Sequence, residues 1–196
     1  MLILASGSAS RARVLAAAGV VFATIPAEVD EAALKDDLLR KGSPLVEVAG
    51  ALADAKAAHV SRVHADALVL GGDQTLLFGE ALVGKCGTLV EARGLLLRLR
   101  GKPHRLVGAL ALARGGEIVW RHTETAQLRM RDFSDAYLDA YLETEGPSLL
   151  AAVGCYKIEG LGVQLFDRIE GDYFSILGLP LLPLLAELRR KGVIAT

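Results

Sequence analysis

The chain opens with LILASGSASRARVLAAAG, residues 2–19, and this stretch predicts how the fold begins. Its first residues, Leu2 to Ala5, form a continuous apolar run, which is typical of a strand buried on both faces of a parallel sheet. Serines and a glycine interrupt the run, and good helix formers follow until Gly19, which is a suitable helix end. We therefore expect a strand, a short hydroxyl-rich loop and a helix.

The loop at residues 6–13 combines several groups that bind anions. A helix start offers free backbone N–H groups and the positive end of the helix dipole. The hydroxyls of Ser6 and Ser8 and the guanidinium of Arg11 add further donors. Together they favour a phosphate chain as the ligand. The alternative is an ordinary serine-capped helix with solvated arginines, since serine is a common N-cap residue.

Composition excludes several classes of protein. The 196 residues carry a formal net charge of -1 and only 5% are aromatic, so we expect no nucleic-acid polymer as a partner. Arginines and prolines break the apolar runs well short of the roughly 20 residues of a spanning helix, and no signal peptide is visible, so we expect no membrane association. The two cysteines, Cys86 and Cys155, form no CxxC pair, and a reducing cytoplasm is the simplest setting.

Strand and helix patterns alternate along the rest of the chain. Strands are expected at residues 20–25, 67–70, 76–78, 81–83, 105–113 and 117–130. Helices are expected at residues 32–41, from a Ser43 cap with Pro44 at the first position through Ala57, from a Thr88 cap to Leu99, after a Ser134 cap, and from Pro180 to Gly192. No linker or repeat divides them, so we expect a single domain of residues 1–196. Its fold would be α/β, with a mixed twisted sheet and a ligand where strands end.

Two further clusters carry candidate chemistry. In GGDQ, residues 71–74, Asp73 would stand just after a buried strand, where it could ligate Mg²⁺ or orient a water. The alternative is a turn-forming aspartate. In GCYKIEGLG, residues 154–162, Lys157 and Glu159 would share one face of a strand, and the glycines indicate closely packed backbone. The alternative there is a loop with a surface ion pair.

Isolated charges complete the set. Lys56 and Lys85 are each typical of solvated lysines, and Glu31 is typical of a surface acid, although it could give a carboxylate to a metal. Phosphate donors and carboxylates occur here without a zinc, cysteine or serine–histidine constellation. That combination favours metal-assisted attack on a phosphate chain with no covalent intermediate. The residues alone therefore predict a Mg²⁺-dependent nucleotide enzyme.

The order and spacing of these motifs resemble those of the Maf family of nucleoside triphosphate pyrophosphatases, from residue 2 to about residue 190. The matching positions are LASGS at 4–8 with Arg11, Lys56, GDQ at 72–74, Gly84-Lys85, and the glycine-punctuated stretch from Gly154 through GDY at 171–173 to GLPL at 178–181. The resemblance implies a fold similar to the inosine triphosphatase type, an elongated mixed sheet flanked by helices with two lobes and a central cleft. It also implies a divalent metal cofactor, Mg²⁺ or Mn²⁺, and hydrolysis of a nucleoside triphosphate to the monophosphate and pyrophosphate.

Carried over position by position, the resemblance implies roles for single residues. Asp73 corresponds to the proton acceptor that activates water, and it would share the metal with Glu31. The phosphate-binding residues would be Ser6, Ser8, Arg11, Lys56 and Lys85. This division is chemically reasonable, because a triphosphate needs several donors whereas the attacking water needs one base.

The chain departs from the common family pattern at positions that indicate which base its nucleotide substrate carries. Many members have an arginine where this chain has Ser10, and a proline where it has Cys86. Phosphate binding in this chain would therefore depend in part on Arg11. Members that act on 7-methyl-GTP tend to lack that arginine and to carry Asp-Gln and Lys-x-Glu-Gly, which here are residues 73–74 and 157–160. Members that act on dTTP and UTP tend to carry Asp-Thr and Ile-Gln-Gly instead.

We therefore expect 7-methyl-GTP as the small-molecule substrate, with Ser10, Gln74, Lys157 and Glu159 shaping the base pocket. Methylation at N7 makes guanine cationic, and the carboxylate of Glu159 would accept its stronger donors better than an amide would. The alternatives are dTTP or UTP as substrate, and a non-catalytic nucleotide-binding regulator of cell division. The sequence does not fix the oligomeric state, and a homodimer is left open.

Overall fold

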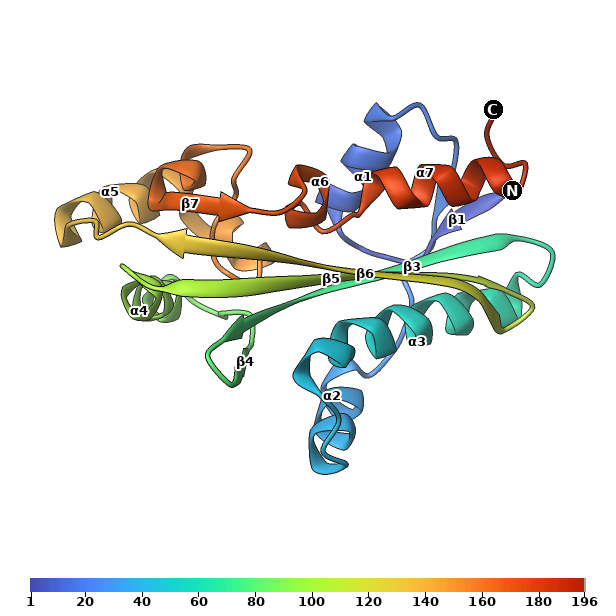
Figure 1. Cartoon of the computed structure of the whole chain (residues 1–196), viewed down its shortest axis with the longest axis horizontal. Helices are drawn as coiled ribbons and strands as arrows, with labels where there is room; N and C mark the ends of the chain where they lie inside the picture. The colour runs from blue at the N-terminus through green and yellow to red at the C-terminus, as the bar shows by residue number, and fades with distance from the viewer. Residues whose placement is uncertain (196) are drawn as a thin grey trace. The chain divides into compact units, whose positions relative to one another are not determined.

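The computed structural model describes residues 1–195, which contain a seven-stranded sheet flanked by helices (Figure 1). The strands are β1 Leu2–Leu4, β2 Ala23–Thr24, β3 Leu68–Phe78, β4 Ala81–Val83, β5 Pro103–Arg114, β6 Glu117–Met130 and β7 Phe166–Glu170. The helices are α1 Ala9–Ala17, α2 Glu31–Arg40, α3 Val48–Val63, α4 Leu89–Leu99, α5 Asp135–Glu145, α6 Tyr173–Ile176 and α7 Leu181–Arg190, with 3₁₀ helices η1 Leu45–Glu47, η2 Gly146–Ala151 and η3 Leu161–Leu165. The strand order is β2-β1-β3-β5-β6-β7, and β4 pairs with β3. The expected mixed α/β sheet is confirmed.

The described residues gather into two compact units. The first unit contains residues 1–74, 107–124 and 172–195, and the second contains residues 75–106 and 125–171. Strands β3, β5 and β6 contribute residues to both units. The expected single domain of two lobes around a cleft stays a prediction. None of the helices within residues 1–195 has the length and apolar character needed to cross a membrane.

In the first unit, the opening apolar run forms β1, which is a buried parallel strand as expected. Leu2 lies opposite Leu68 of β3, and Ile3 lies opposite Ala23 of β2, with parallel pairing on both sides. The strand predicted at residues 20–25 is shorter than expected, because β2 spans only two residues. The N–H of Val20 bonds to the carbonyl of Leu15 at 3.3 Å, so this part of the segment completes the turn after α1.

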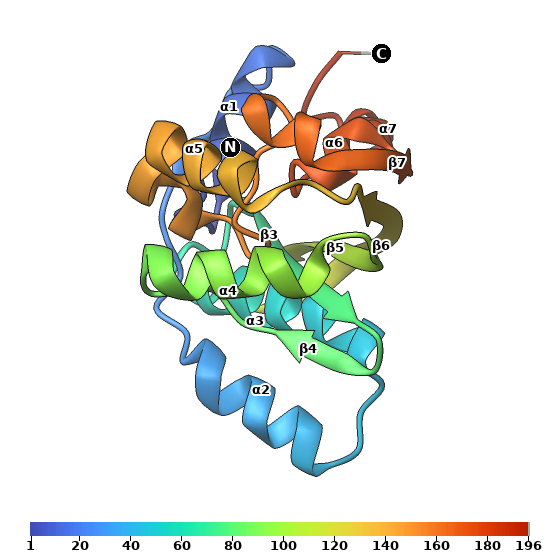
Figure 2. The same ribbon diagram turned by 90° about the vertical axis from the view of Figure 1, so that its left-hand side faces the viewer.

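Helices cover both faces of this part of the sheet, with α1 and α7 on one face and α3 on the other (Figures 1 and 2). Alternate residues of β1 face different helices, as the period of a strand requires. Leu2 packs in a cluster with Leu15 of α1 and Leu184 of α7. Ile3 packs instead in a cluster with Val60 of α3. The alternation explains why the strand must be apolar on both faces.

Strand β3 continues through the two glycines, so Asp73 lies inside a strand and not at its end. The sequence-based placement of Asp73 just after the strand is therefore wrong. A Cβ atom on Gly71 would lie 2.2 Å from the carbonyl oxygen of Ala53 and 2.7 Å from the amide nitrogen of Ala57. Gly71 thus permits the close approach of α3 to β3, and the strand does not need to turn there.

The start of α3 also differs from the prediction. Ser43 does not cap a helix, because η1 intervenes and α3 begins only at Val48. Pro44 has φ −56° and ψ 135°, which is an extended conformation that holds it outside the helical turn. The chain therefore enters α3 through a short 3₁₀ turn without a side-chain cap.

The second unit forms its local elements largely as expected. The β3–β4 hairpin places Phe78 opposite Ala81. Thr88 accepts a hydrogen bond from the N–H of Glu91 and caps α4, and Ser134 caps α5 in the same way. On β6, buried Ala126, Leu128 and Met130 alternate with exposed residues 125, 127 and 129, as the period of a strand requires.

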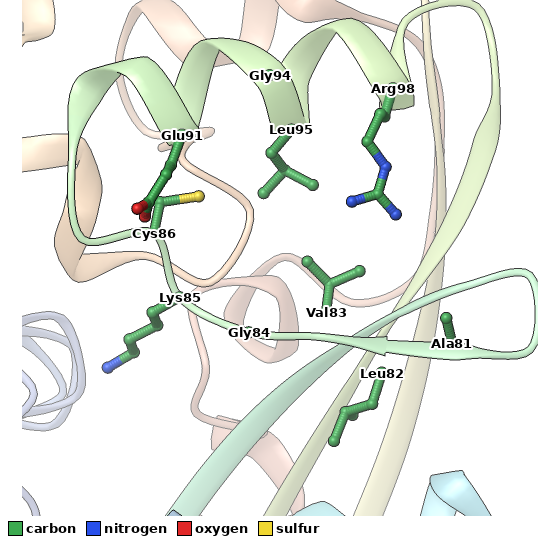
Figure 3. Close-up of a pocket in the computed structure, with 10 residues that line it drawn as sticks. All are labelled: Ala81, Leu82, Val83, Gly84, Lys85, Cys86, Glu91, Gly94, Leu95 and Arg98. Atoms are coloured by element: carbon green, nitrogen blue, oxygen red, sulfur yellow. The ribbon is translucent and has the colours of Figure 1, made fainter.

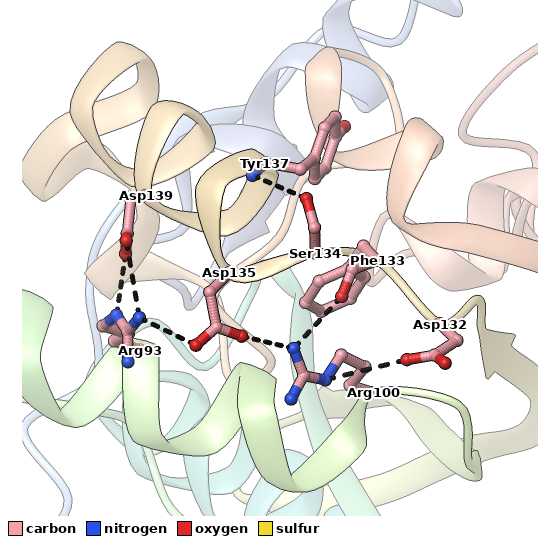
Figure 4. Close-up of polar contacts among 8 residues, drawn as sticks. All are labelled: Arg93, Arg100, Asp132, Phe133, Ser134, Asp135, Tyr137 and Asp139. Carbon is pink, nitrogen blue, oxygen red and sulfur yellow. Dashed lines mark hydrogen bonds and ion pairs between the residues drawn. The ribbon is translucent and has the colours of Figure 1, made fainter.

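Ion pairs join α4 to the start of α5 in this unit (Figure 4). The Nε of Arg93 lies 2.7 Å from Oδ1 of Asp139, and the Nη1 of Arg100 lies 2.6 Å from Oδ1 of Asp135. Arg100 also donates to the carbonyl of Phe133 at 3.1 Å. All of these carboxylates are exposed, so water and salt screen the pairs and each contributes little to stability.

Candidate functional site

Asp73, Lys56 and Glu31 meet in the first unit, where they come from β3, α3 and the first turn of α2. The Nζ of Lys56 lies 2.7 Å from Oδ1 of Asp73 and 2.8 Å from Oε1 of Glu31. The side chains of Lys56 and Asp73 are only 9% and 10% exposed, and that of Glu31 is 43% exposed. The interpretation of Lys56 as a solvated lysine is therefore wrong.

The close packing at Gly71 explains how a lysine comes to be buried here. Lys56 lies between Ala53 and Ala57 along α3, and both alanines touch Gly71. Residues three and four apart share a helix face, so Lys56 extends from near this contact. Gly71 and Asp73 are two apart on a strand and therefore point to the same face. The ammonium group consequently meets the carboxylate of Asp73.

Arg11 is the other buried cation of this unit, with 8% of its surface exposed. Its Nε donates to the carbonyl of Gly178 at 2.8 Å, and its Nη1 donates to the hydroxyl of Ser6 at 3.1 Å. Burial lowers the pKa of Arg11, and the negative charges of Asp73 and Glu31 oppose that effect. The guanidinium stays protonated, because its intrinsic pKa is far above neutrality. Arg11 therefore brings a fixed positive charge to the two carboxylates.

The hydroxyls of the opening loop organise the start of α1. The Oγ of Ser8 accepts the N–H of Arg11 at 3.3 Å, and the Oγ of Ser6 accepts the N–H of Ser8 at 3.3 Å. Ser8 is thus the N-cap of α1, as the capped-helix interpretation expects. Capping does not exclude phosphate binding, because each hydroxyl has further hydrogen-bonding capacity. The role of both serines as phosphate ligands stays a prediction.

Ser10 and Gln74, the expected base-selecting residues of the first unit, are bound to backbone. The Oγ of Ser10 donates to the carbonyl of Leu177 at 3.2 Å. The Nε2 of Gln74 donates to the carbonyls of Ser175 and Ile176 at 2.9 Å and 3.1 Å. Both side chains therefore hold the same segment, and neither contact was foreseen from the sequence.

Lys85 belongs to the second unit, where it follows β4 on the segment that leads to α4. This segment borders a groove of about 470 Å³ between β4 and α4, with Val83 and Leu95 on its walls (Figure 3). Arg98 lies in the groove, whereas Lys85 points away from it (Figure 3). A role for Lys85 toward phosphate stays a prediction.

Lys157 and Glu159 also belong to the second unit. Residues 157–159 are not a strand, so the argument that both side chains share a strand face is wrong. Close packing of the glycines is confirmed, since a Cβ on Gly162 would lie 2.5 Å from the carbonyl oxygen of Lys157. The Nζ of Lys157 donates to the hydroxyl of Ser148 at 2.8 Å, and Glu159 is exposed. Their role toward the base stays a prediction.

Sequence reasoning included Asp172 in a motif but gave it no role, and it missed Ser175 and Glu124, which lie around α6 in the first unit. The Oδ1 of Asp172 accepts the N–H of Ser175 at 2.8 Å and caps α6. The Oγ of Ser175 donates to Oε2 of Glu124 at 2.8 Å. Aspartate is a preferred N-cap residue, and this signal could have assigned Asp172 to the start of a helix. Nothing in the local sequence points to Glu124.

The acids of the first unit are the candidates for holding a metal. Among residues 1–195, no group of three or more His, Cys, Asp and Glu side chains is placed to bind a metal ion. Mg²⁺, however, is often held by one or two carboxylates together with the phosphates of the substrate. Glu31 and Asp73 are such a pair, since both contact Lys56. The donor set fits Mg²⁺ or Mn²⁺ that binds together with a triphosphate.

Comparison with known proteins adds an independent finding. A family model described as Maf-like protein matches residues 1–191. A protein of Granulibacter bethesdensis named nucleoside triphosphate pyrophosphatase is 50% identical over 189 residues, which cover 96% of this chain and 96% of that protein. A protein of Rhizobium meliloti named 7-methyl-GTP pyrophosphatase is 47% identical over 194 residues, which cover 99% of this chain and 98% of that protein.

A third relative agrees with the first. A protein of Caulobacter vibrioides named nucleoside triphosphate pyrophosphatase is 50% identical over 191 residues, which cover 97% of this chain and 96% of that protein. The family match over residues 1–191 therefore spans both units.

Proposed function

The chain belongs to the Maf-like protein family and is a nucleoside triphosphate pyrophosphatase, and from this premise we propose that it hydrolyses 7-methyl-GTP with Asp73 as the proton acceptor. The products would be 7-methyl-GMP and pyrophosphate. The observation that carries the proposal is the contact of the buried Lys56 with the buried Asp73 and with the partly exposed Glu31.

Asp73 is suited to take a proton from the attacking water. Its carboxylate is held in place inside a strand by a hydrogen bond from Lys56 at 2.7 Å. Oδ1 receives that bond, and the other oxygen of the carboxylate can accept the proton. A base with a fixed position can contribute about 100-fold or more to the rate. A divalent ion bound beside Glu31 and Asp73 would offset phosphate charge and make the water more acidic.

Several cations are suited to bind the triphosphate. Arg11 and Lys56 bring fixed positive charge close to the two carboxylates. Ser6 and Ser8 lie at the N-terminal end of α1, where the helix dipole favours an anion. Lys85 would add a further charge from the second unit. Stabilisation of the phosphate charge by such preorganised groups is the usual source of catalysis in phosphoryl transfer.

The choice of 7-methyl-GTP rests on Ser10, Gln74, Lys157 and Glu159. Relatives named 7-methyl-GTP pyrophosphatase are 45–48% identical to this chain over nearly its whole length. A carboxylate at Glu159 would accept the donors of a cationic guanine more strongly than an amide would. The free thiols of Cys86 and Cys155 suit a reducing compartment, and we place the enzyme in the cytoplasm on that basis.

The test is a panel of 7-methyl-GTP, GTP, UTP and dTTP with Mg²⁺ or Mn²⁺, with pyrophosphate release as the readout. We expect the highest kcat/KM for 7-methyl-GTP, and a loss of activity when the metal is chelated. Asp73→Asn should lower kcat by about 100-fold or more. The matched control is Asp37→Asn, since Asp37 pairs with Lys41 on the surface of α2.

Two outcomes would contradict the proposal. A folded Asp73→Asn enzyme with nearly full activity would exclude Asp73 as the proton acceptor. A preference for UTP or dTTP over 7-methyl-GTP would exclude the proposed substrate and leave the hydrolytic activity intact.

A further inference from the structure

Four consecutive backbone carbonyls, those of residues 175–178, accept hydrogen bonds from side chains that are distant in the sequence. The Nε2 of Gln74 donates to the first two of these carbonyls, at 2.9 Å and 3.1 Å. Ser10 donates to the third at 3.2 Å, and the Nε of Arg11 donates to the fourth at 2.8 Å. We call residues 175–178 the carbonyl turn. It is therefore held by side chains from α1 and β3.

The carbonyl turn is also fixed from its own side. Ser175 is 3% exposed, its N–H donates to Asp172, and its hydroxyl donates to Glu124 at 2.8 Å. The turn ends at Gly178, which has φ +91°. A residue with a side chain rarely adopts that conformation, so the backbone path at the end of the turn requires a glycine. Each of the four carbonyls of the turn thus accepts a side-chain hydrogen bond, and Ser175 anchors its first residue.

The same side chains connect the carbonyl turn to the candidate catalytic residues. Gln74 directly follows Asp73 on β3. Arg11 passes close to the strand at Gly72, where an added Cβ would lie 3.2 Å from its Nε. The charge of Arg11 also acts on Asp73 and Glu31. A shift of the turn would therefore move Arg11 relative to these two acids.

Gln74 and Ser10 suit this task chemically. A glutamine amide has two N–H donors at the end of a long side chain, and here it reaches two carbonyls at once. Threonine, the residue expected at this position in the pyrimidine-specific pattern, has one donor on a short side chain and could not make both bonds. An arginine at position 10 would likewise replace a short hydroxyl contact with a large charged group.

We propose that the carbonyl turn is a specificity-determining element. Ser10 and Gln74 influence the choice of base because they set the position of the turn. Ser175 is a further positioning residue. The inference rests on the proposed function, which makes positions 10 and 74 selective. The inference gives Ser10 and Gln74 a different role, because both residues act through the carbonyl turn and not by contact with the base.

The experiment measures kcat and KM for 7-methyl-GTP and for UTP in the full-length enzyme and in three variants. Ser175→Ala removes the hydroxyl bond to Glu124, Ser175→Thr keeps a hydroxyl, and Gln74→Thr removes the paired amide donors. Since one hydrogen bond changes an equilibrium by about fivefold, we expect Ser175→Ala and Gln74→Thr to lower the ratio of kcat/KM for 7-methyl-GTP over UTP by about fivefold or more. The effect should lie mainly in KM, and Ser175→Thr should restore the ratio.

Ser10→Ala is a second route to the same result, because Ser10 is partly exposed and its loss should not prevent folding. Thr144→Ala is the matched control, since this hydroxyl bonds to the carbonyl of Ala140 on the exposed surface of α5. An unchanged substrate ratio in folded Ser175→Ala, Gln74→Thr and Ser10→Ala enzymes would overturn the inference. So would an equal fall of kcat on both substrates.

Measurements on the wild-type enzyme distinguish the proposed substrate from the proposed role of the carbonyl turn. Failure of the wild type to prefer 7-methyl-GTP contradicts the proposed substrate. The ratio between the two substrates can still be measured in the variants, and its change or constancy decides the inference about the carbonyl turn.

Discussion

The ammonium nitrogen of Lys56 lies 2.7 Å from Oδ1 of Asp73, and about nine-tenths of each side chain is buried. Burial removes both charges from water, so each depends on the other for stabilisation. Glu31 adds a second carboxylate at 2.8 Å from the same nitrogen. The pair is the centre of the proposed site, and removal of either partner would leave the other charge buried without compensation.

Lys56→Met should destabilise the protein and inactivate it. The substitution leaves the carboxylate of Asp73 buried without its partner, which typically costs about 3 kcal/mol or more. Urea unfolding should show this decrease in the free energy of unfolding, and pyrophosphate release should fall in parallel. Lys41→Met is the control, because Lys41 is 69% exposed and its pair with Asp37 should contribute little. Equal stability of the two variants would contradict the argument.

Gly71→Ala should be strongly destabilising, because its Cβ would lie 2.2 Å from the carbonyl oxygen of Ala53. Either α3 or β3 would have to move, and we expect a loss of about 3 kcal/mol or more in the free energy of unfolding. Gly94→Ala in α4 is the matched control, since nothing lies within 4 Å of its added Cβ. That change should raise stability by about 1 kcal/mol through helix propensity. Thermal or urea unfolding of both variants distinguishes these outcomes.

These glycines show which parts of the fold the sequence could predict. The strand that begins at Leu2, the cap at Ser134 and the strands at residues 76–78 and 81–83 depend on neighbours in the chain, and all of them are confirmed. The strand was expected to end at residue 70, before Gly71, because the close approach of α3 that Gly71 permits is not contained in the local sequence. Long-range packing therefore sets the limit of the fold prediction.

The same limit applies to the candidate site. Asp73 could be chosen from its place beside a buried strand, but the burial of Lys56 depends on how α3 packs against β3. Likewise, the sequence marks Ser10 and Gln74 as unusual, and only the fold shows that both bind the carbonyl turn. Residue types and spacing thus identify candidates, whereas partners come from tertiary contacts.

Cys86 and Cys155 should differ in their reactivity toward an alkylating agent. Burial raises the pKa of the Cys155 thiol to about 12, and a hydrogen bond with Cys86 acts in the same direction. The thiolate is the reactive form, so Cys155 should resist iodoacetamide at pH 8, whereas the partly exposed Cys86 should react. Peptide mass spectrometry measures both sites. Cys86→Ser should remain unlabelled until urea exposes Cys155, and native labelling of Cys155 would contradict its burial.

His104 should make the stability of the protein depend on pH. It is 3% exposed, its Nε2 lies 2.7 Å from the hydroxyl of Tyr156, and burial lowers its pKa from 6.5 to about 4. Between these values the unfolded chain binds a proton that the folded chain does not, so acid favours unfolding. The free energy of unfolding should therefore fall by about 3 kcal/mol from this group as the pH drops from 7 to 4.

His104→Gln tests this contribution, because glutamine can bond to Tyr156 and does not titrate. Urea unfolding at several pH values between 7 and 4 should show a shallower fall in stability for the variant than for the wild type. The control is His59→Gln on α3, since the His59 ring is exposed in the folded as well as the unfolded chain. Its pH profile should follow the wild type. If His104→Gln keeps the wild-type slope, the ring is already hydrated in the folded state and its burial does not control the acid sensitivity.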